Sequence, residues 1–258
     1  MKNDNLLKPG KYYHIYNCGI NGTDLFKVRE DYERFLNLYS KYINPVCETF
    51  AWVLMGNHFH LLVKIKENII YKYSKSDYSN DKEKFNEIKW ETVEKDADFI
   101  RKITCQRPTQ EDLTALKKSW LNEKLNCQPP TQEDLALTIK VPKPHLHFSH
   151  LFNAYAKYFN LKYKRHGSLF ERQFRRKLVD NKRYFRSLVI YIHQNPVHHG
   201  FCQHVLDYAW SSYLTCITLK PTKLYRNAMI GWFDNLANFK LMHGNKIEIE
   251  RLEDWLGF

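Results

Sequence analysis

Two histidines one residue apart stand in the segment AWVLMGNHFHLLVKI, which spans residues 51–65. Alternate residues of a β-strand point to the same face, so His58 and His60 would project together if this segment is a strand. Two neutral imidazoles side by side can bind a divalent metal ion, but most such pairs are simply half-buried residues of a sheet. His145 and His147 repeat the spacing after two prolines, at the edge of a polar region. The spacing alone leaves both interpretations open.

A tyrosine and an asparagine stand one helical turn apart in the segment LVIYIHQNPVHHGF, residues 188–201. Tyr191 and Asn195 would therefore face the same point if this segment is a helix. If that helix packs beside the histidine strand, Asn195 could offer an amide oxygen to a metal ion, and Tyr191 could hold its phenol nearby. Such a metal keeps positions for phosphate oxygens, acts as a Lewis acid and favours a nucleophilic phenolate. A core tyrosine followed by a helix-ending Asn-Pro pair is the competing interpretation, which the chemistry alone slightly favours.

The net charge of +12 and the pI near 9.3 favour a polyanionic partner, because phosphates neutralised by Lys or Arg release counterions. The positive charge is concentrated between residues 157 and 186, where 11 Lys or Arg stand against two acidic residues. Aromatic side chains interleaved in this stretch could stack on bases, although aromatics at helical spacing are more often core. A solvated basic face without a partner is the alternative.

Length and composition narrow the class of protein. The chain of 258 residues suffices for one large domain or for one domain with an insertion, and its 43% hydrophobic content predicts a globular protein. No apolar run of about 18 residues occurs, which predicts no membrane span. The start, MKNDNLLKPGKYYHIYN, lacks the apolar stretch of a signal peptide, so we expect a cytoplasmic protein. The six cysteines are scattered without a CxxC pair, which predicts free thiols rather than a zinc finger.

Hydrophobic periodicity outlines a β-α-β-β unit before residue 66 and an α-β-α unit after residue 147. The expected strands are 11–19, 48–55, 58–65 and 168–179, and the expected helices are 29–43, 149–167 and 181–194. Gly56-Asn57 predicts a type II′ turn between antiparallel neighbours, and Pro196 should end the last helix. The pattern predicts an α+β fold of ferredoxin-like type, an antiparallel sheet with helices packed on one face.

Residues 66–147 differ in composition from the rest, since Lys, Glu, Asp, Asn and Ser dominate them. This region contains a direct repeat, RPTQEDL at 107–113 and PPTQEDL at 129–135, and each copy fits a helix start. Two copies fall short of the three or so that a solenoid requires, so we expect a polar, mainly helical surface insertion. The expected organisation is a first half at 1–65, the insertion at 66–147, a second half at 148–215 and a C-terminal helical extension at 216–258.

Four blocks of the sequence together resemble a known family: WVLMGNHFHLLV, GSLFERQFRRKLV, YIHQNPVHHGF and WSSY. They are similar to the HUH-type single-strand DNA transposases with one catalytic tyrosine. Within that class the chain most resembles the REP-associated tyrosine transposase group, also called the insertion-sequence-200-like transposase domain. The matching blocks lie within residues 10–65 and 148–215, and the His-hydrophobe-His and Tyr-x-x-x-Asn-Pro elements occur in the family's order.

The resemblance implies a metal-dependent enzyme that cleaves single-stranded DNA beside a hairpin and transfers the strand. It assigns His58, His60 and Asn195 as ligands of Mg²⁺ or Mn²⁺. It assigns Tyr191 as the nucleophile, which attacks a phosphodiester and leaves a 5′-phosphotyrosine link and a free 3′-OH. In some branches of the family the helix ligand is a glutamine, which makes the adjoining Gln194 the alternative, although the helical spacing favours Asn195.

Under this resemblance the basic residues would hold the sugar-phosphate backbone of single-stranded or hairpin DNA without selecting its sequence. The candidates are Arg172, Arg175, Arg176 and Lys177, with Arg165 in the loop before them. Tyr184, one heptad before Tyr191, is the rival nucleophile. A domesticated hairpin-binding protein without transposition activity is the alternative function. Either function implies a nucleoid-associated protein, and homodimer and monomer both stay open.

Overall fold

The computed structural model describes residues 6–67, 69–72, 91–94, 139–171 and 173–244. The chain divides into two compact units, one formed by Met1–Ile65 together with Pro144–Phe258 and the other by Lys66–Lys143. The segments on either side of the insertion therefore fold together, and they contain the candidate site residues. Of those candidates, Arg172 lies outside the described residues.

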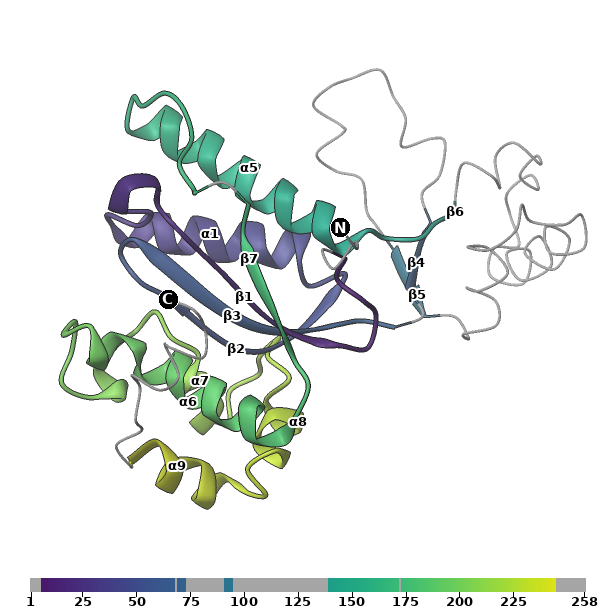
Figure 1. Ribbon diagram of the computed structural model, residues 1–258, viewed down its shortest axis with the longest axis vertical. Coiled ribbons are helices and arrows are strands. Elements are labelled where there is room, and N and C mark those ends of the chain that lie inside the picture. The colour runs from purple at the N-terminus through teal and green to yellow at the C-terminus, as the bar shows by residue number, and fades with distance from the viewer. Residues whose placement is uncertain (1–5, 68, 73–90, 95–138, 172, 245–258) are drawn as a thin grey trace, which may run out of the picture. The chain divides into compact units, whose positions relative to one another are not determined.

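A four-stranded antiparallel sheet forms the centre of the first unit (Figure 1). Its strands are β1 (Tyr12–Cys18), β2 (Cys47–Leu54), β3 (His58–Ile65) and β7 (Arg175–Val179), in the order β2-β3-β1-β7. Helices α1 (Arg29–Tyr42) and α5 (Pro144–Lys162) connect them in the ferredoxin-like succession β-α-β-β-α-β. The predicted fold class, α+β with an antiparallel sheet, is confirmed.

Helices cover both faces of this sheet, whereas the sequence predicted helices on one face (Figure 1). On one face lie α1 and α5. On the other lie α6 (Lys182–His198), α7 (Tyr213–Ile217), α8 (Arg226–Gly231) and α9 (Leu236–Gly244). The reason is visible in β3, where Phe59, His60, Leu61, Leu62 and Val63 are all buried. A strand with consecutive buried residues needs a cover on each side.

A buried carboxylate ties α1 to α5. The Asp31 side chain is fully buried and accepts hydrogen bonds from Lys162 Nζ and Tyr163 Oη, both at 2.7 Å. It also accepts the backbone N–H groups of Lys27 and Val28, which would otherwise be unpaired at the start of α1. Burial alone would raise the pKa of Asp31, but these hydrogen bonds outweigh burial and lower it. Asp31 thus fixes the layer of helices on this face.

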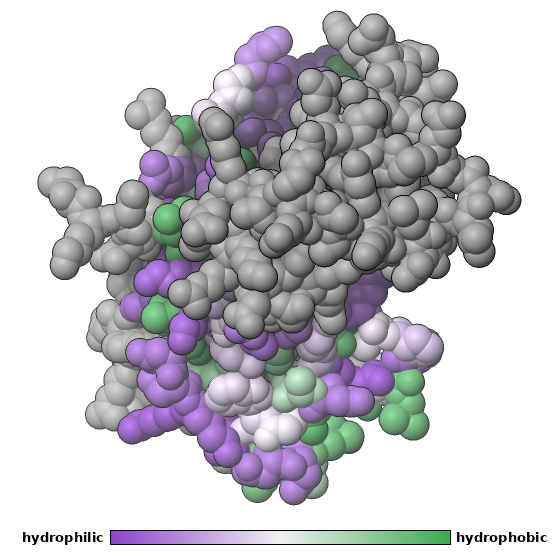
Figure 2. Space-filling model, turned by 90° about the vertical axis from the view of Figure 1, so that its right-hand side faces the viewer, coloured by the Kyte–Doolittle hydropathy of each residue, from purple (hydrophilic) through white to green (hydrophobic). Residues whose placement is uncertain are grey.

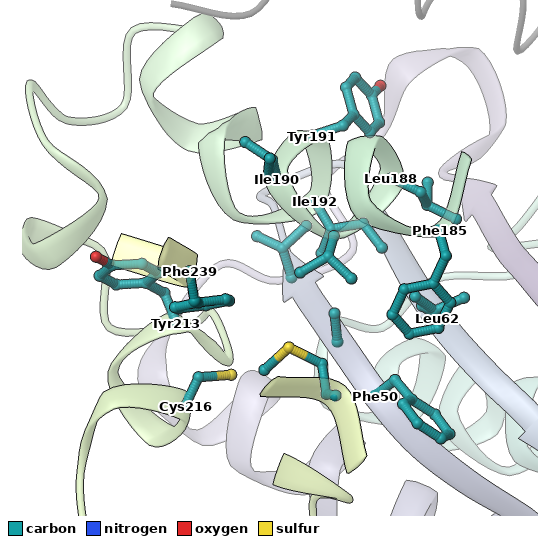
Figure 3. Packing of buried hydrophobic residues seen from close by; sticks show 14 of the residues in the cluster. Phe50, Leu62, Phe185, Leu188, Ile190, Tyr191, Ile192, Tyr213, Cys216 and Phe239 are labelled. Carbon is teal, nitrogen blue, oxygen red and sulfur yellow. The ribbon is translucent and has the colours of Figure 1, made fainter. Parts of the chain in front are cut away.

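An apolar cluster fills the space between α6 and the sheet (Figure 3). Phe185 and Ile192, two helical turns apart on α6, lie in this cluster with Phe50 of β2 and Leu62 of β3. Residues seven apart return to the same side of a helix, so one stripe of α6 faces the sheet. This packing fixes the rotation of α6 about its axis and hence the direction of its other side chains.

The outer edge of β2 pairs with the segment that follows α6. The Leu54 N–H donates to the Trp210 carbonyl, and the Ser212 N–H donates to the Trp52 carbonyl, both at 2.9 Å. The block WSSY therefore covers an edge strand, whose open backbone groups would otherwise be able to pair with another chain.

A chain of buried hydrogen bonds joins α6 to α9. His193 Nδ1 lies 2.9 Å from His243 Nε2, and His193 Nε2 lies 2.8 Å from Ser212 Oγ. His243 Nδ1 lies 2.7 Å from the Phe239 carbonyl, which can only accept, so this nitrogen of His243 donates. His193 must then donate to His243, and the Ser212 hydroxyl donates to His193. Burial lowers the pKa of both imidazoles, so near pH 7 both are neutral and these hydrogen bonds fix their tautomers.

We expect this arrangement to make the protein less stable in acid. Burial lowers the pKa of His243 to about 4 from the ordinary value of 6.5. Between these values the unfolded chain binds the proton and the folded chain does not, so the free energy of unfolding falls as the pH falls. Between pH 6.5 and about pH 4, protonation of His243 should lower the free energy of unfolding by about 3 kcal/mol in total, at about 1.4 kcal/mol per pH unit. Urea unfolding of the full chain between about pH 7 and about pH 4 measures the fall.

His243→Gln provides the control for this prediction. Glutamine keeps an oxygen that can accept from His193 but has no group that titrates in this range. The variant should lose less stability than the unmodified protein as the pH falls. An identical pH dependence in both proteins would show that the burial of His243 is not a source of acid sensitivity.

Two local predictions were wrong in detail. β2 and β3 are antiparallel neighbours, but Gly56 lacks the positive φ that a type II′ turn requires. Its carbonyl instead accepts the N–H groups of Leu25 and Phe26 at 2.7 and 2.9 Å, and these distant partners shape the loop. Helix α6 also continues through Pro196 to His198. Proline removes one N–H near the helix end, and the following turn keeps its own hydrogen bonds.

The described part of the second unit is a small antiparallel sheet. Its strands are β4 (Ile69–Lys72), β5 (Glu91–Glu94) and β6 (Ile139–Lys140), in the order β5-β4-β6. The composition predicted a mainly helical insertion, whereas these described residues are strands. The repeated segments 107–113 and 129–135 lie outside the described residues.

The described surface visible in Figure 2 is mostly hydrophilic, with apolar side chains in small separate groups. Exposed apolar residues such as Leu161 and Leu219 belong to different parts of the chain. Within the described ranges, no helix combines the length and the apolar character needed to cross a bilayer.

Candidate active site

The histidines of β3 and the helix α6 meet on one face of the sheet. His58 Nε2 lies 3.0 Å from Asn195 Oδ1, although 137 residues separate the two in sequence. The ring of Tyr191 meets the ring of His60 edge-on, with 5.4 Å between the centroids. The rings of His58 and His60 are themselves 5.2 Å apart. The histidine pair of β3 and the Tyr191–Asn195 pair of α6, which are far apart in sequence, therefore form one cluster.

The start of β3 is held in place by the segment that follows β1. The Gly19 N–H donates to the Asn57 carbonyl at 2.8 Å, and the Leu25 N–H donates to the Gly56 carbonyl at 2.7 Å. Residue 19 has to be glycine, because a Cβ there would lie 1.8 Å from the carbonyl oxygen of Thr23. This close approach lets the segment wrap around the loop and fix the point at which β3 begins.

Helix α6 presents Tyr191 and Asn195 to the histidines and directs Gln194 elsewhere. Figure 3 shows Tyr191 on the side of α6 away from the packed apolar side chains, with its hydroxyl pointing away from them. Gln194 donates from Nε2 to the His243 carbonyl at 2.8 Å, so its side chain binds α9. Burial raises the pKa of Tyr184, which keeps that phenol protonated. The geometry favours Asn195 over Gln194, and Tyr191 has a ring contact with His60.

Both histidines of β3 are neutral near pH 7. Burial lowers the pKa of His58, and burial with the neighbouring imidazoles lowers the pKa of His60 well below its ordinary value. A neutral imidazole has one N–H, so His58 can donate to one of the two amide oxygens that face it. These are Asn57 Oδ1, 2.7 Å from Nδ1, and Asn195 Oδ1, 3.0 Å from Nε2. One of the two contacts therefore lacks a proton.

A divalent cation fits the contact that lacks a proton. Neighbouring ligand atoms of an octahedral ion held at about 2.1 Å lie about 3.0 Å apart, which is the separation of His58 Nε2 and Asn195 Oδ1. Asn57 would then accept the Nδ1 proton of His58, the outer hydrogen bond that metal-binding histidines usually make. The Asn195 amide nitrogen is buried without a hydrogen-bond partner among the described residues.

The donor set would be two imidazoles and one amide. In the part of the chain that the structure describes, no group of three or more His, Cys, Asp or Glu side chains is placed to hold a metal ion. Asn195 Oδ1, 3.0 Å from His58 Nε2, is the candidate for the third ligand atom. None of the three donors is negatively charged, whereas hard cations prefer anionic oxygen ligands.

The basic residues of β7 divide between the two faces of the sheet. In the register with β1, Arg175 and Lys177 point to the face of the histidines and α6. Arg176 points to the face covered by α5, where its guanidinium lies 5.1 Å from the centre of the Phe174 ring. Two of the predicted phosphate contacts therefore share a face with the site, and the third does not.

Arg165 lies apart from the site residues, in the loop after α5. Its guanidinium donates to Asn160 Oδ1 at 3.4 Å and to the Ser168 carbonyl at 3.5 Å. These contacts stabilise the loop itself, and the structure does not bring Arg165 together with the histidines.

His145 and His147 have the spacing of the site histidines but do not lie in a strand. Helix α5 begins at Pro144, so both belong to its first turn. His147 Nδ1 lies 2.9 Å from the carbonyl oxygen of Tyr42. Residues two apart on a helix point in different directions, which separates this pair from the pair on β3.

The structure adds two histidines to the site that the sequence analysis did not assign to it. His14 Nε2 lies 2.9 Å from His60 Nδ1, and the ring of His199 lies 5.3 Å from the ring of His58. His199 follows Asn195 by one helical turn, so the helical period could have found it. For His14, the alternation of a strand predicts only the face of the sheet to which the side chain points. Its contact with His60 depends on the register of β1 with β3, which the sequence does not reveal.

Comparison with known proteins adds a solved structure to these observations. No protein-family model matches the chain, and no curated protein matches it. The solved structure of a REP-associated tyrosine transposase bound to a REP hairpin is similar, at 14% sequence identity and a TM-score of 0.45. The match covers 86% of this chain and 88% of that chain. A similarity this distant does not establish membership of a family, so the function has to be argued from the site.

Proposed function

We propose that the protein is a metal-dependent enzyme that cleaves single-stranded DNA beside a hairpin and transfers the strand, with Tyr191 as its nucleophile. One observation carries the proposal: Asn195 reaches His58 at 3.0 Å, and Tyr191, one turn away, contacts the ring of His60. These contacts support Tyr191 as the nucleophile and His58, His60 and Asn195 as the ligands of Mg²⁺ or Mn²⁺ in this proposal. The net charge of +12 supports a polyanionic substrate.

In the proposed reaction one bond forms and one breaks. The phenol of Tyr191 gives up its proton to solvent as its oxygen attacks the phosphorus atom, the bond to the 3′ oxygen breaks, and the 5′ end stays linked to Tyr191. The departing 3′ oxygen takes up a proton. Attack by a 3′-OH in the reverse sense releases Tyr191 and joins the strands. His58, His60 and Asn195 would hold a divalent ion, which when bound supplies Lewis-acid polarisation of the phosphate.

Replacing Arg175 or Lys177 with alanine should weaken binding of hairpin DNA with single-stranded flanks. Both side chains lie on the face of the histidines, where they can hold the sugar-phosphate backbone. The logarithm of the binding constant falls linearly with the logarithm of the salt concentration. Removing a side chain that neutralises one phosphate should make this negative slope shallower by about 0.7 to 0.9. Fluorescence anisotropy over a salt series measures this slope.

Arg176→Ala is the matched control, since it removes the same kind of charge from the same strand on the opposite face. It should leave the salt dependence almost unchanged. Equal effects of Arg175→Ala and Arg176→Ala on this slope would show that the DNA does not lie on the face of the histidines.

Incubating the full chain with a labelled DNA hairpin that has single-stranded flanks tests the proposed function. With Mg²⁺ or Mn²⁺ present, part of the label should migrate with the protein in a denaturing gel, and chelation by EDTA should prevent this. A protein that only binds hairpins would shift the same DNA in a native gel without forming the adduct. No adduct with either metal across varied hairpins would reject the proposed enzyme.

A further inference from the structure

His14 lies in β1 and is fully buried on the face of the sheet that carries the site. Its Nε2 atom lies 2.9 Å from His60 Nδ1, and its ring stacks on Tyr16 with 4.6 Å between the centroids. Its other nitrogen, Nδ1, is buried without a hydrogen-bond partner among the described residues. An apolar side chain would fill this place without leaving a nitrogen unpaired, so packing alone does not account for a histidine here.

The hydrogen bond between the two imidazoles contains one proton, whose position decides what His60 offers to the site. If His14 donates, His60 carries its own proton on Nε2, and that nitrogen cannot bind a cation. If His60 donates from Nδ1, its Nε2 has a lone pair and can bind a cation. A metal ligand requires the second arrangement, and that arrangement needs an acceptor beside Nδ1. His14 Nε2 lies where this acceptor must be.

We propose that His14 is a positioning residue, which accepts the Nδ1 proton of His60 and so fixes the ring and tautomer in which His60 Nε2 binds the divalent cation. This inference rests on the proposed function. Asn57 would play the same role for His58 by accepting its Nδ1 proton, because Asn57 Oδ1 lies 2.7 Å from His58 Nδ1. Each ligand histidine then has its own outer partner, and such partners typically change metal affinity by about 10- to 100-fold when they are removed.

His14→Phe and His14→Gln separate the hydrogen-bond acceptor from the ring. Phenylalanine keeps a flat ring against Tyr16 but cannot accept a proton, whereas glutamine can place an amide oxygen near His60 Nδ1. Each change is made in the full chain with Tyr191→Phe, which cannot react. Binding of Mn²⁺ in the presence of hairpin DNA is then followed by electron paramagnetic resonance. His14→Phe should weaken Mn²⁺ binding by about 10- to 100-fold, and His14→Gln should bind more tightly than His14→Phe.

Further measurements distinguish positioning from general damage to the fold. DNA binding in EDTA should be the same with and without His14→Phe. His147→Phe, which removes a histidine hydrogen bond on α5, should leave the Mn²⁺ affinity unchanged. In the protein with native His14, saturated with Mg²⁺ and DNA, nitrogen NMR should show His60 protonated on Nδ1 and not on Nε2. Protonation on Nε2, or loss of DNA binding in EDTA by His14→Phe, would overturn the inference.

The outcomes separate the inference from the function on which it rests. If the protein with native His14 binds no Mn²⁺ even with DNA, the proposed metal-dependent function and the inference both fail. If it binds Mn²⁺ and His14→Phe binds Mn²⁺ equally well, only the role of His14 fails.

Discussion

Replacing Tyr191 with phenylalanine should abolish the covalent adduct with single-stranded DNA while leaving DNA binding almost unchanged. The substitution removes the oxygen that attacks the phosphate, and the rate of adduct formation should fall by at least about 10³-fold. Phenylalanine keeps the ring that meets His60 edge-on at 5.4 Å, so the packing of α6 on the sheet is preserved. A denaturing gel measures the adduct, and fluorescence anisotropy measures the binding.

Tyr184→Phe is the matched control, because it removes a second phenol from the same helix. Tyr184 stands two helical turns before Tyr191 on α6, away from the turn that carries Asn195, and should contribute nothing to the chemical step. Normal adduct formation is expected from this variant. An adduct that persists in Tyr191→Phe and disappears in Tyr184→Phe would move the nucleophile two turns along the helix.

Replacing Asn195 with alanine should lower the rate of metal-dependent cleavage by at least about 100-fold, because the substitution removes one of the three proposed ligands. Raising the Mn²⁺ concentration should recover part of the activity, since the two histidines remain. The fold should tolerate the change, because the substitution also removes a buried amide nitrogen that has no partner among the described residues. Adduct formation measured across a Mn²⁺ titration, with a thermal melt in parallel, separates these effects.

Gln194→Ala provides the comparison for Asn195. Gln194 carries the same amide group one residue earlier, but it donates to the His243 carbonyl and so binds α6 to α9. Its removal should lower the thermal midpoint slightly and leave the metal dependence unchanged. If Gln194→Ala raised the Mn²⁺ requirement and Asn195→Ala did not, the third ligand would have been assigned to the wrong residue.

The parts of the site that the sequence predicted are those that depend on a local period. The two-residue period of a strand placed His58 and His60 on one face, and the helical turn placed Tyr191 and Asn195 together. The order of strands and helices then indicated a ferredoxin-like sheet, which the structure confirms. The sequence suggested, but did not establish, that helix α6 packs beside strand β3. The contact between His58 and Asn195 shows that it does.

The parts that the sequence did not predict depend on register and on distant contacts. His14 meets His60 because of how β1 and β3 are aligned, and that alignment is set by packing across the whole sheet. The loop at Gly56 takes its shape from Leu25 and Phe26, which are about 30 residues away along the chain. The alternation of β7 puts Arg175 and Arg176 on opposite faces, whereas their shared positive charge alone groups them together.

The position of the covalent bond is the most direct test of the central claim. Trypsin cleaves after Arg183 and Arg186, so it releases Tyr184 in the peptide YFR and leaves Tyr191 in a separate peptide that begins at Ser187. Mass spectrometry of the digested adduct should find the nucleotide on this second peptide, and fragmentation should place it on Tyr191. A nucleotide on YFR, or on any residue other than Tyr191, would contradict the assignment of the nucleophile to the cluster of His58, His60 and Asn195.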